Sequence, residues 1–276
     1  MKATPTRIEA RFAELGATNR AALIPFITAG DPVFPDTVAL MHALVAAGAD
    51  AIELGVPFSD PMADGPVIQR ASERALGKSV GTRKVLEMVA RFRRDDQNTP
   101  VILMGYLNPV ESYGYERFAE DASAAGVDGT IVVDLPPEEA AELSAIFDDA
   151  EVSTVFLLSP TTTAERINMV AERGRGFVYY ISVTGVTGGK AIQAEVTAEA
   201  VAAVREEVRL PICVGFGIRD AQSARRVADY ADGVIVGSAL IAAMEDAAAA
   251  DADVVAAAGA LLRTLRAAMD DARQAA

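Results

Sequence analysis

The sequence predicts a (β/α)8 TIM barrel, an α/β fold in which eight parallel strands alternate with helices. The first observation is that short apolar runs rich in β-branched residues alternate with longer segments of helical period. The second is that eight such runs fit into 276 residues, which is the size of this barrel. The third is that no linker-like stretch separates them, so we expect one domain over residues 1–276.

The expected strands follow in chain order. They cover residues 22–28, 50–54, 101–104, 129–133, 153–158, 176–182, 210–215 and 233–237. Helical periodicity between them is clearest at residues 82–92, 164–172 and 220–230. An extra N-terminal helix is expected from Thr6 to Leu15, with Thr6 as its N-cap, covering the bottom of the barrel. The Ala-rich stretch 244–276 is interrupted by charged residues, which is typical of a helix at the edge of the molecule.

An open, doubly wound sheet shows the same alternation and is the alternative fold. It usually carries a glycine-rich turn directly after its first strand, whereas this turn reads Thr28-Ala29-Gly30-Asp31-Pro32. The barrel is therefore preferred. Because barrels place function in the loops at the carboxyl ends of their strands, the long loops 55–81 and 182–195 are the first candidates for binding loops.

Composition excludes several classes of function. The net charge of −14 argues against nucleic acid and anionic membrane surfaces. The single cysteine, Cys213, allows no internal disulfide, no signal-peptide pattern opens the sequence, and no apolar run is long enough for a bilayer, so we expect a cytoplasmic protein. The only histidine, His42, lies in a helical pattern, which excludes a zinc site or a Ser-His-Asp triad. No lysine ends a strand-like run, which disfavours Schiff-base chemistry.

Carboxylates gather at the end of the second strand. Period-two alternation places Glu53 on the face opposite Ile52 and Leu54. If that face is the barrel interior, desolvation raises the pKa of Glu53 and suits it to proton transfer; a structural glutamate paired with arginine or backbone amides is the alternative. Asp60 and Asp64 follow in a proline-stiffened loop, and we expect the three acids to raise one another's pKa values. Both aspartates also fit capping roles in turns.

Glycines mark the ends of the seventh and eighth strands, in Gly215-Phe216-Gly217 and Gly237-Ser238-Ala239. Glycines at the start of a helix expose backbone N–H groups to an anion, and barrels commonly bind phosphate at these two strands. The pair predicts a phosphorylated substrate. The glycine-rich run 184–189 after the sixth strand can contribute to the same site and close over a ligand.

Several segments, in order along nearly the whole chain, resemble one family. The segment from Glu53 to Pro61, Ala63-Asp64-Gly65-Pro66 and Ile68-Gln69 form its main signature. The other segments are Pro25 to Pro32, Gly105 to Pro109, Asp134 to Pro137 and Thr184 to Gly188. With these segments the sequence resembles the tryptophan synthase alpha subunit family.

The resemblance implies a lyase that cleaves indole-3-glycerol phosphate to indole and glyceraldehyde 3-phosphate in tryptophan biosynthesis. It implies that Glu53 is the general acid-base residue and that Asp64 accepts a hydrogen bond from the indole N–H. The residues implied to contact the substrate are Phe26, Tyr106, Tyr179 and Phe216 around the indole ring, Gly188, Gly217, Gly237 and Ser238 at the phosphate, and Thr187 in the sixth loop.

The resemblance also implies a partner. This is a pyridoxal-phosphate-dependent beta subunit that receives indole through a tunnel in an α2β2 heterotetramer, with Pro57 to Asp60 close to the contact. No metal or organic cofactor is expected in this chain. After Gly188 the chain departs from the family pattern, with Gly189-Lys190 in place of a small residue and an arginine. We expect Thr187 to meet Asp64 in a closed state, and this departure bears on how that closure responds to the partner.

Two other functions remain open at this point. One is a phosphate-binding barrel isomerase or aldolase of another specificity, which the lack of a catalytic histidine and of a strand-end lysine disfavours. The other is a noncatalytic or free-standing phosphate-binding subunit, which Glu53 and Asp64 disfavour. The sequence alone leaves open whether activity depends on the beta subunit.

Overall fold

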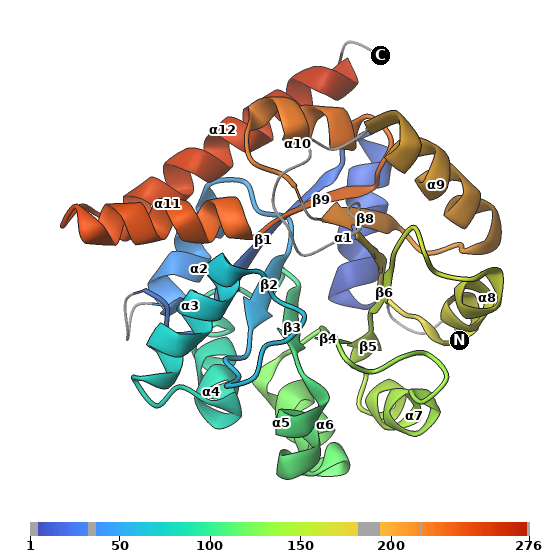
Figure 1. Ribbon diagram of the computed structural model, residues 1–276, viewed down its shortest axis with the longest axis horizontal. Coiled ribbons are helices and arrows are strands. Elements are labelled where there is room, and N and C mark those ends of the chain that lie inside the picture. Colours follow the sequence, from blue (N-terminus) through green and yellow to red (C-terminus); the bar gives the residue numbers. More distant parts are fainter. Residues whose placement is uncertain (1–4, 33–36, 182–193, 216, 275–276) are drawn as a thin grey trace.

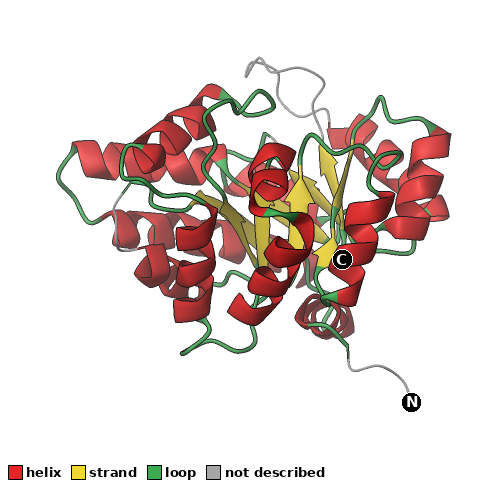
Figure 2. Ribbon diagram, turned by 90° about the horizontal axis from the view of Figure 1, so that it is seen from below, coloured by secondary structure: helices red, strands yellow, loops and turns green. Residues whose placement is uncertain are grey.

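A ring of parallel strands lies at the centre of the molecule and helices surround it (Figures 1 and 2). The computed structural model describes residues 5–32, 37–181, 194–215 and 217–274. The strands within these residues are β1 (Ala22–Thr28), β2 (Ile52–Gly55), β3 (Val101–Gly105), β4 (Gly129–Val132), β5 (Ser153–Thr154), β6 (Phe156–Leu158), β7 (Val178–Ile181), β8 (Ile212–Gly215) and β9 (Gly233–Val236). The helices are α1 (Arg7–Ala17), α2 (Thr37–Ala46), α3 (Pro66–Leu76), α4 (Thr82–Phe92), α5 (Leu107–Tyr113), α6 (Tyr115–Ala125), α7 (Ala141–Asp149), α8 (Ala164–Arg173), α9 (Ala194–Glu207), α10 (Ala221–Ala228), α11 (Ser238–Ala249) and α12 (Val254–Gln274).

The strands close into a barrel through one interrupted segment. Their order is β5-β4-β3-β2-β1-β9-β8-β7-β6, and the two ends of this order, β5 and β6, are consecutive in the chain. The run expected at 153–158 is split at Val155, whose N–H still donates to the carbonyl of Thr130. β5 pairs with β4 and β6 pairs with β7, so the ring is complete. The barrel prediction is confirmed, and the open sheet is wrong.

The structure corrects the reading of the second loop. All eight predicted runs contain strands and α4 spans the predicted 82–92, but the predicted loop 55–81 contains helix α3. Gly65 is the N-cap of α3 and Pro66 occupies its first turn, where a missing N–H costs no helical bond. Only the irregular part before Pro66 is a loop. The single-domain assignment stays a prediction, and none of the described helices is both long and apolar enough to cross a bilayer.

Helix α1 closes the bottom of the barrel, as the sequence predicted, and lies at one end of the strands in Figure 2. Thr6 and Glu9 form a reciprocal capping box that fixes its first turn. Ile8 is 1% exposed and packs into the interior cluster of the barrel. A Cβ on Gly129 or Gly176 would lie 3.3 or 3.2 Å from Ile8 Cδ1, respectively. These two glycines therefore leave space for the Ile8 side chain of α1.

Three aspartates tie neighbouring strands together at the same end of the barrel. Asp128 and Asp232 directly precede β4 and β9, and Asp50 lies two residues before β2. Each aspartate makes two bonds to one residue of the adjacent strand. The backbone N–H of the aspartate donates to the carbonyl of Leu23, Val101 or Ile212, respectively. The carboxylate of the same aspartate accepts the N–H of that residue at 2.9, 2.7 and 2.8 Å. We call these three arrangements the aspartate clamps.

An arginine neutralises each aspartate clamp. Asp50 pairs with Arg266 at 3.1 Å, Asp128 with Arg93 at 2.5 Å, and Asp232 with Arg205 at 2.8 Å. The side chains of two of these arginines pack against a glycine in the turn before the aspartate. A Cβ on Gly126 would lie 2.7 Å from Arg93, and a Cβ on Gly48 would lie 2.8 Å from Arg266. Both glycines also have positive φ, so the motif Gly-x-Asp has a steric and a conformational reason.

We expect the more deeply buried aspartate clamps to contribute more to the free energy of unfolding. Asp128→Ala leaves the charge of Arg93, whose side chain is 7% exposed, without its paired carboxylate and should lower the free energy of unfolding by about 3–5 kcal/mol. Asp232→Ala removes the equivalent strand and arginine bonds from a pair whose side chains are 32% and 44% exposed, but not the additional bond that Asp128 makes to Arg7 at 2.9 Å. That variant should lose only about 1–2 kcal/mol. Urea unfolding of both variants measures the difference, and equal losses would contradict this account of the clamps.

Candidate active site

Glu53 lies inside the barrel on β2, level with Phe26 of β1. It is fully buried, and neither carboxyl oxygen has a hydrogen-bond partner among the described residues. Desolvation raises the pKa of Glu53 to about 8, because nothing nearby compensates a negative charge. The structural alternative, a glutamate paired with arginine or amides, therefore does not fit. The carboxyl group holds its proton at neutral pH and faces the interior, as the period-two pattern predicted.

Asp64 lies above the strand end in the loop before α3. The hydroxyl of Tyr106 donates to Asp64 Oδ2 at 3.1 Å and accepts the N–H of Ala63 at 3.0 Å. Desolvation raises the pKa of Asp64 to about 6, and the hydrogen bond from Tyr106 opposes that rise. The hydroxyl of Tyr106 stays protonated and remains a donor, because burial and the adjacent Asp64 raise its pKa well above the usual range. Asp64 is thus ionised above about pH 6, whereas the carboxyl of Glu53 is still protonated there.

The cause of these pKa shifts differs from the sequence-based expectation. Three acids were expected to raise one another's pKa values, but burial is the only cause acting on Glu53 and the largest acting on Asp64. Asp60 is exposed and accepts a hydrogen bond from Ser59 at 2.5 Å. It therefore belongs to the surface of the loop rather than to a carboxylate cluster.

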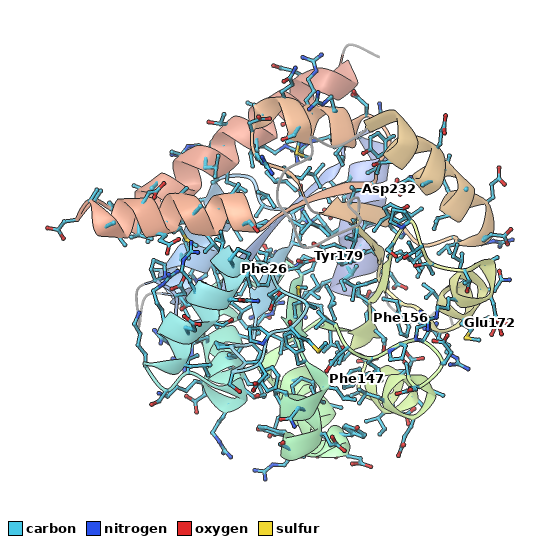
Figure 3. All side chains as sticks on the ribbon, viewed as in Figure 1. Phe26, Phe147, Phe156, Glu172, Tyr179 and Asp232 are labelled. Carbon is cyan, nitrogen blue, oxygen red and sulfur yellow. The ribbon has the colours of Figure 1, made fainter. Side chains whose placement is uncertain are left out.

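Aromatic side chains come from β1, from β7 and from the residue directly after β3. Phe26 and Tyr179 lie near the middle of the ring of strands in Figure 3 and are each 5% exposed. Phe26 packs directly against Gly55, where a Cβ would meet its ring at 2.7 Å, and Tyr179 packs in the same way against Gly215. The ring of Tyr106 stacks at 5.1 Å on Phe58 of the second loop. The contact of Phe26, Tyr106 and Tyr179 with a substrate stays a prediction.

A pocket at the mouth of the barrel is lined by Phe26, Asp64 and Tyr106, but not by Glu53 or Tyr179. Its lining residues are Phe26, Thr28, Gly55, Val56, Asp64, Ile68, Ser72, Met104, Gly105, Tyr106 and Val133. The sequence analysis missed Ile68 and Ser72, which form a wall from helix α3. Their spacing of four residues on one helix face was the signal, and it was overlooked because the segment was interpreted as loop. Thr28 was missed too: its hydroxyl is buried without a partner among the described residues.

The start of α11 is one of the two segments where the sequence analysis expected phosphate to bind. Gly237 is its N-cap with no side-chain hydrogen bond, so the first N–H groups of the helix are not capped by that residue. Ser238 is the first residue of α11, and Gly237 lies against Phe26, where a Cβ would be 3.4 Å away. Gly217, after β8, has a φ of +78°, a conformation that favours glycine. Phe216, Thr187 and Gly188 lie outside the described residues.

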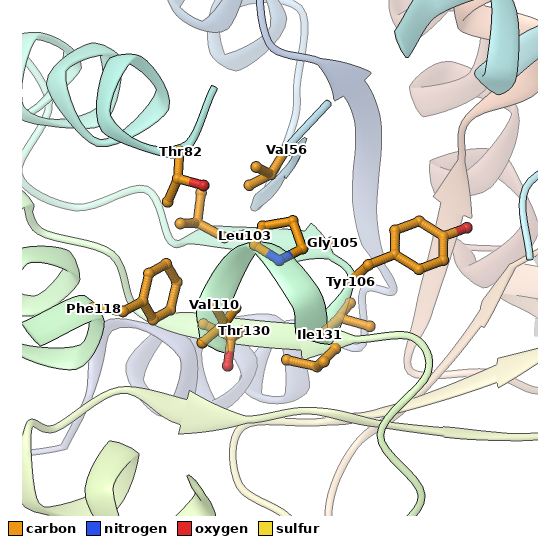
Figure 4. A pocket seen from close by; sticks show the side chains of 11 residues that line it. Val56, Thr82, Leu103, Gly105, Tyr106, Val110, Phe118, Thr130 and Ile131 are labelled. Carbon is orange, nitrogen blue, oxygen red and sulfur yellow. The ribbon is translucent and has the colours of Figure 1, made fainter. Parts of the chain in front are cut away.

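A second cavity adjoins the site behind β3 and β4 (Figure 4). It shares Val56, Gly105 and Tyr106 with the mouth pocket, and Val110 and Phe118 line its far side. Figure 4 shows the hydroxyl of Tyr106 directed away from this cavity, consistent with its bond to Asp64. Among the described residues no group of three or more His, Cys, Asp or Glu side chains could hold a metal ion. His42 instead packs its ring at 4.7 Å from Phe92.

The barrel, with Glu53 buried inside it and Asp64 at its mouth, has the architecture of a barrel enzyme with two candidate acid-base carboxylates. The family follows from comparison with known proteins. The model of the tryptophan synthase alpha chain family matches residues 12–270, and the chain belongs to this family. Membership confirms the expected fold and the expected lyase of tryptophan biosynthesis, which cleaves indole-3-glycerol phosphate. The noncatalytic alternative is not favoured.

Similarity extends over nearly the whole chain. The tryptophan synthase alpha chain of Bordetella bronchiseptica is 55% identical over 98% of both chains, and that of Laribacter hongkongensis is 56% identical over 96% of this chain and 99% of its own. The crystal structure of tryptophan synthase subunit alpha from Legionella pneumophila is 47% identical, with a TM-score of 0.92 over 97% of this chain and 100% of that chain. Mycobacterium tuberculosis tryptophan synthase gives a TM-score of 0.86 at 39% identity over 96% of this chain and 99% of that chain.

The Tyr106 hydroxyl should set the ionisation of Asp64. Tyr106→Phe removes the donor and keeps the ring, so we expect the pKa of Asp64 to rise further above its present value by about 0.5 unit or more. The titration of the Asp64 carboxyl in isotope-labelled protein measures this shift. Tyr113→Phe is the matched control, because it removes a 2.6 Å bond to Asp121 far from the site. A shift of equal size in the control would contradict the local origin of the effect.

Proposed function

We propose that this chain cleaves indole-3-glycerol phosphate with Glu53 as the proton carrier and Asp64 as the anion that stabilises the indole ring. The observation that carries the proposal is the fully buried carboxyl of Glu53, which has no partner among the described residues and a pKa of about 8. A group that keeps its proton at neutral pH and is surrounded by apolar walls is suited to protonate carbon.

The proton balance of the reaction needs only one such group. Protonated Glu53 donates to C3 of the indole, which gives an indolenine cation. The resulting carboxylate then takes the proton from the hydroxyl on the adjacent carbon of the glycerol chain. The C–C bond breaks, its electron pair returns to the indole ring, and the hydroxyl-bearing carbon becomes the aldehyde of glyceraldehyde 3-phosphate. Glu53 ends in its starting state and no external acid or base is consumed.

Asp64 supports this step electrostatically. Protonation of C3 places positive charge on the indole nitrogen, and an ionised carboxylate that accepts its N–H stabilises that charge in a water-poor pocket. Tyr106 occupies Oδ2, and Oδ1 has no partner among the described residues, so one oxygen is available to the ring. Phe26, Tyr106 and Tyr179 would hold the ring in place, together with Phe216.

The phosphate group would bind at the start of α11. Gly237 and Ser238 offer backbone N–H groups and a hydroxyl at the positive end of a helix of 12 residues. Gly217 of the neighbouring strand end would complete the cradle with Gly188. Thr187 and its contact with Asp64 in a closed state remain predictions.

The partner we propose is a tryptophan synthase beta subunit in an α2β2 heterotetramer. It would supply the pyridoxal phosphate and receive indole from this chain, which itself would need no cofactor. Met62 is 82% exposed beside the Pro57 to Asp60 segment, and an apolar side chain at that place fits a surface that a partner covers. A cytoplasmic location agrees with this role and remains a prediction.

Replacing Glu53 tests the proton carrier directly. Glu53→Gln keeps the shape of the side chain and removes the proton that C3 needs, so kcat should fall by about 100-fold or more while substrate affinity stays within about tenfold. In the parent enzyme kcat/KM should decline above about pH 8, where Glu53 ionises, and below about pH 6, where Asp64 takes up a proton. Indole release measured across pH gives both results. Near-parental turnover in Glu53→Gln would overturn the assignment.

A bulky residue at the start of α11 tests the phosphate position. Ser238→Leu removes a hydroxyl donor and fills the space before the helix, so the affinity for glycerol 3-phosphate should fall at least about tenfold, or 1.4 kcal/mol. Calorimetry with this ligand measures the change. The matched comparison is Ser238→Ala, which should lose much less affinity. Ser144→Leu on α7 is less suitable as a control because Ser144 is buried. Unchanged affinity in Ser238→Leu would place the phosphate elsewhere.

A further inference from the structure

A polar cluster joins helix α3, which follows Asp64, to helix α11, which begins at Ser238. Its members are Asp31 after β1, Arg70 and Arg74 on α3, and Glu245 on α11, and we call it the α3–α11 cluster. Arg74 donates to both oxygens of Asp31, at 2.5 and 2.9 Å, and to Glu245 at 2.8 Å. Arg70 binds the same Glu245 with two further bonds, of 3.0 and 2.8 Å.

The geometry of the cluster is fixed rather than loose. Asp31 is 2% exposed, and burial raises its pKa while the guanidinium of Arg74 opposes the rise. Two parallel N–H···O bonds to a buried carboxylate hold a guanidinium in one plane, which a lysine cannot do. The third arm of Arg74 then reaches α11. One side chain therefore sets the distance between the end of β1, helix α3 and helix α11.

Helix α3 in turn holds Asp64. The helix begins at Pro66, two residues after Asp64, and the side-chain amide of Gln69 donates to the carbonyl of Asp64 at 2.9 Å. The same helix supplies Ile68 and Ser72 to the pocket wall. A displacement of α3 is thus a displacement of Asp64 and of one wall of the pocket.

Helix α11 begins at the proposed phosphate position. Glu245 lies two turns along α11 from Ser238, on the side of the helix that contacts α3. The cluster therefore joins α11, whose first turn is the proposed phosphate position, to α3, which follows Asp64. Figure 1 shows α3 and α11 as neighbours at the edge of the barrel.

We propose that Arg74 and Glu245 are positioning residues, which set the place of Asp64 relative to the phosphate-binding end of α11. This inference rests on the proposed function, because it assigns the two ends of one substrate to Asp64 and Ser238. The substrate spans both ends, so a shift of α3 against α11 moves Asp64 off the indole N–H while the phosphate remains bound. A misplacement of about 1 Å is enough to cost a large factor in rate.

The test is Glu245→Ala, examined with Asp64 present and with Asp64→Asn. Alanine keeps the helix and removes both links to α3. We expect kcat to fall about tenfold with Asp64 present and less than about twofold in the Asp64→Asn background, since a positioning effect has nothing left to position. Indole formation with enzyme in excess makes the slow variants measurable. The affinity for glycerol 3-phosphate, which would bind at the phosphate end of the site and not at Asp64, should stay within about twofold.

Two further variants make the test decisive. Glu138→Ala breaks a comparable exposed pair, Arg166 to Glu138 at 2.6 Å, and should leave kcat unchanged. Arg74→Lys keeps the charge beside Asp31 and loses the planar fork, so it should repeat the effect of Glu245→Ala. An equal loss of kcat in both Asp64 backgrounds, or no loss at all, would overturn the inference. A near-parental kcat in Asp64→Asn alone would instead overturn the proposed function.

Discussion

The structure depends on keeping one unpartnered carboxyl group dry. Glu53 is enclosed on every side, and its ionised form is disfavoured because no described residue donates a hydrogen bond to it. Its pKa is higher in the folded chain than in the unfolded chain, so the folded state binds the proton more tightly. This group therefore lowers the free energy of unfolding progressively as pH rises from about 4.5 to about 8. Helix α1 at one end of the barrel and the packed interior exclude water from Glu53 and thereby maintain its raised pKa.

The same residue type has opposite functions at the two ends of the barrel. At the bottom, Asp50 and Asp128 each accept hydrogen bonds from a backbone N–H and from an arginine, and these bonds hold neighbouring strands together. At the top, Asp64 receives only the hydroxyl of Tyr106 among the described residues. An aspartate with satisfied bonds contributes to stability, whereas one left incompletely bonded in a pocket is available to a ligand. Partners, rather than position in the sequence, separate structural from candidate catalytic carboxylates.

Sequence patterns predicted the parts of the fold that depend on periodicity. The strands and the inward direction of Glu53 follow from alternation, and the helix 82–92 follows from its apolar face. Helix α3 was missed because Pro66 and the preceding turn residues were taken to continue a loop, although proline is favoured in a first helical turn. The bond from Tyr106 to Asp64 joins residues 42 positions apart, so no local pattern contains it. The burial that shifts the two pKa values likewise exists only once the barrel has closed.

The aspartate clamps also divide the barrel into two unequal parts. They join β1 to β2, β3 to β4 and β8 to β9, which are six strands in one continuous arc of the ring. The remaining strands, β5, β6 and β7, include the interruption at Val155 and have no such clamp among the described residues. Amide protons on the arc should then exchange with solvent only through global unfolding, and those on β6 and β7 through smaller, local openings. Glu53 and Phe26 lie on the arc. Local opening at β6 and β7 can therefore occur without moving these two residues.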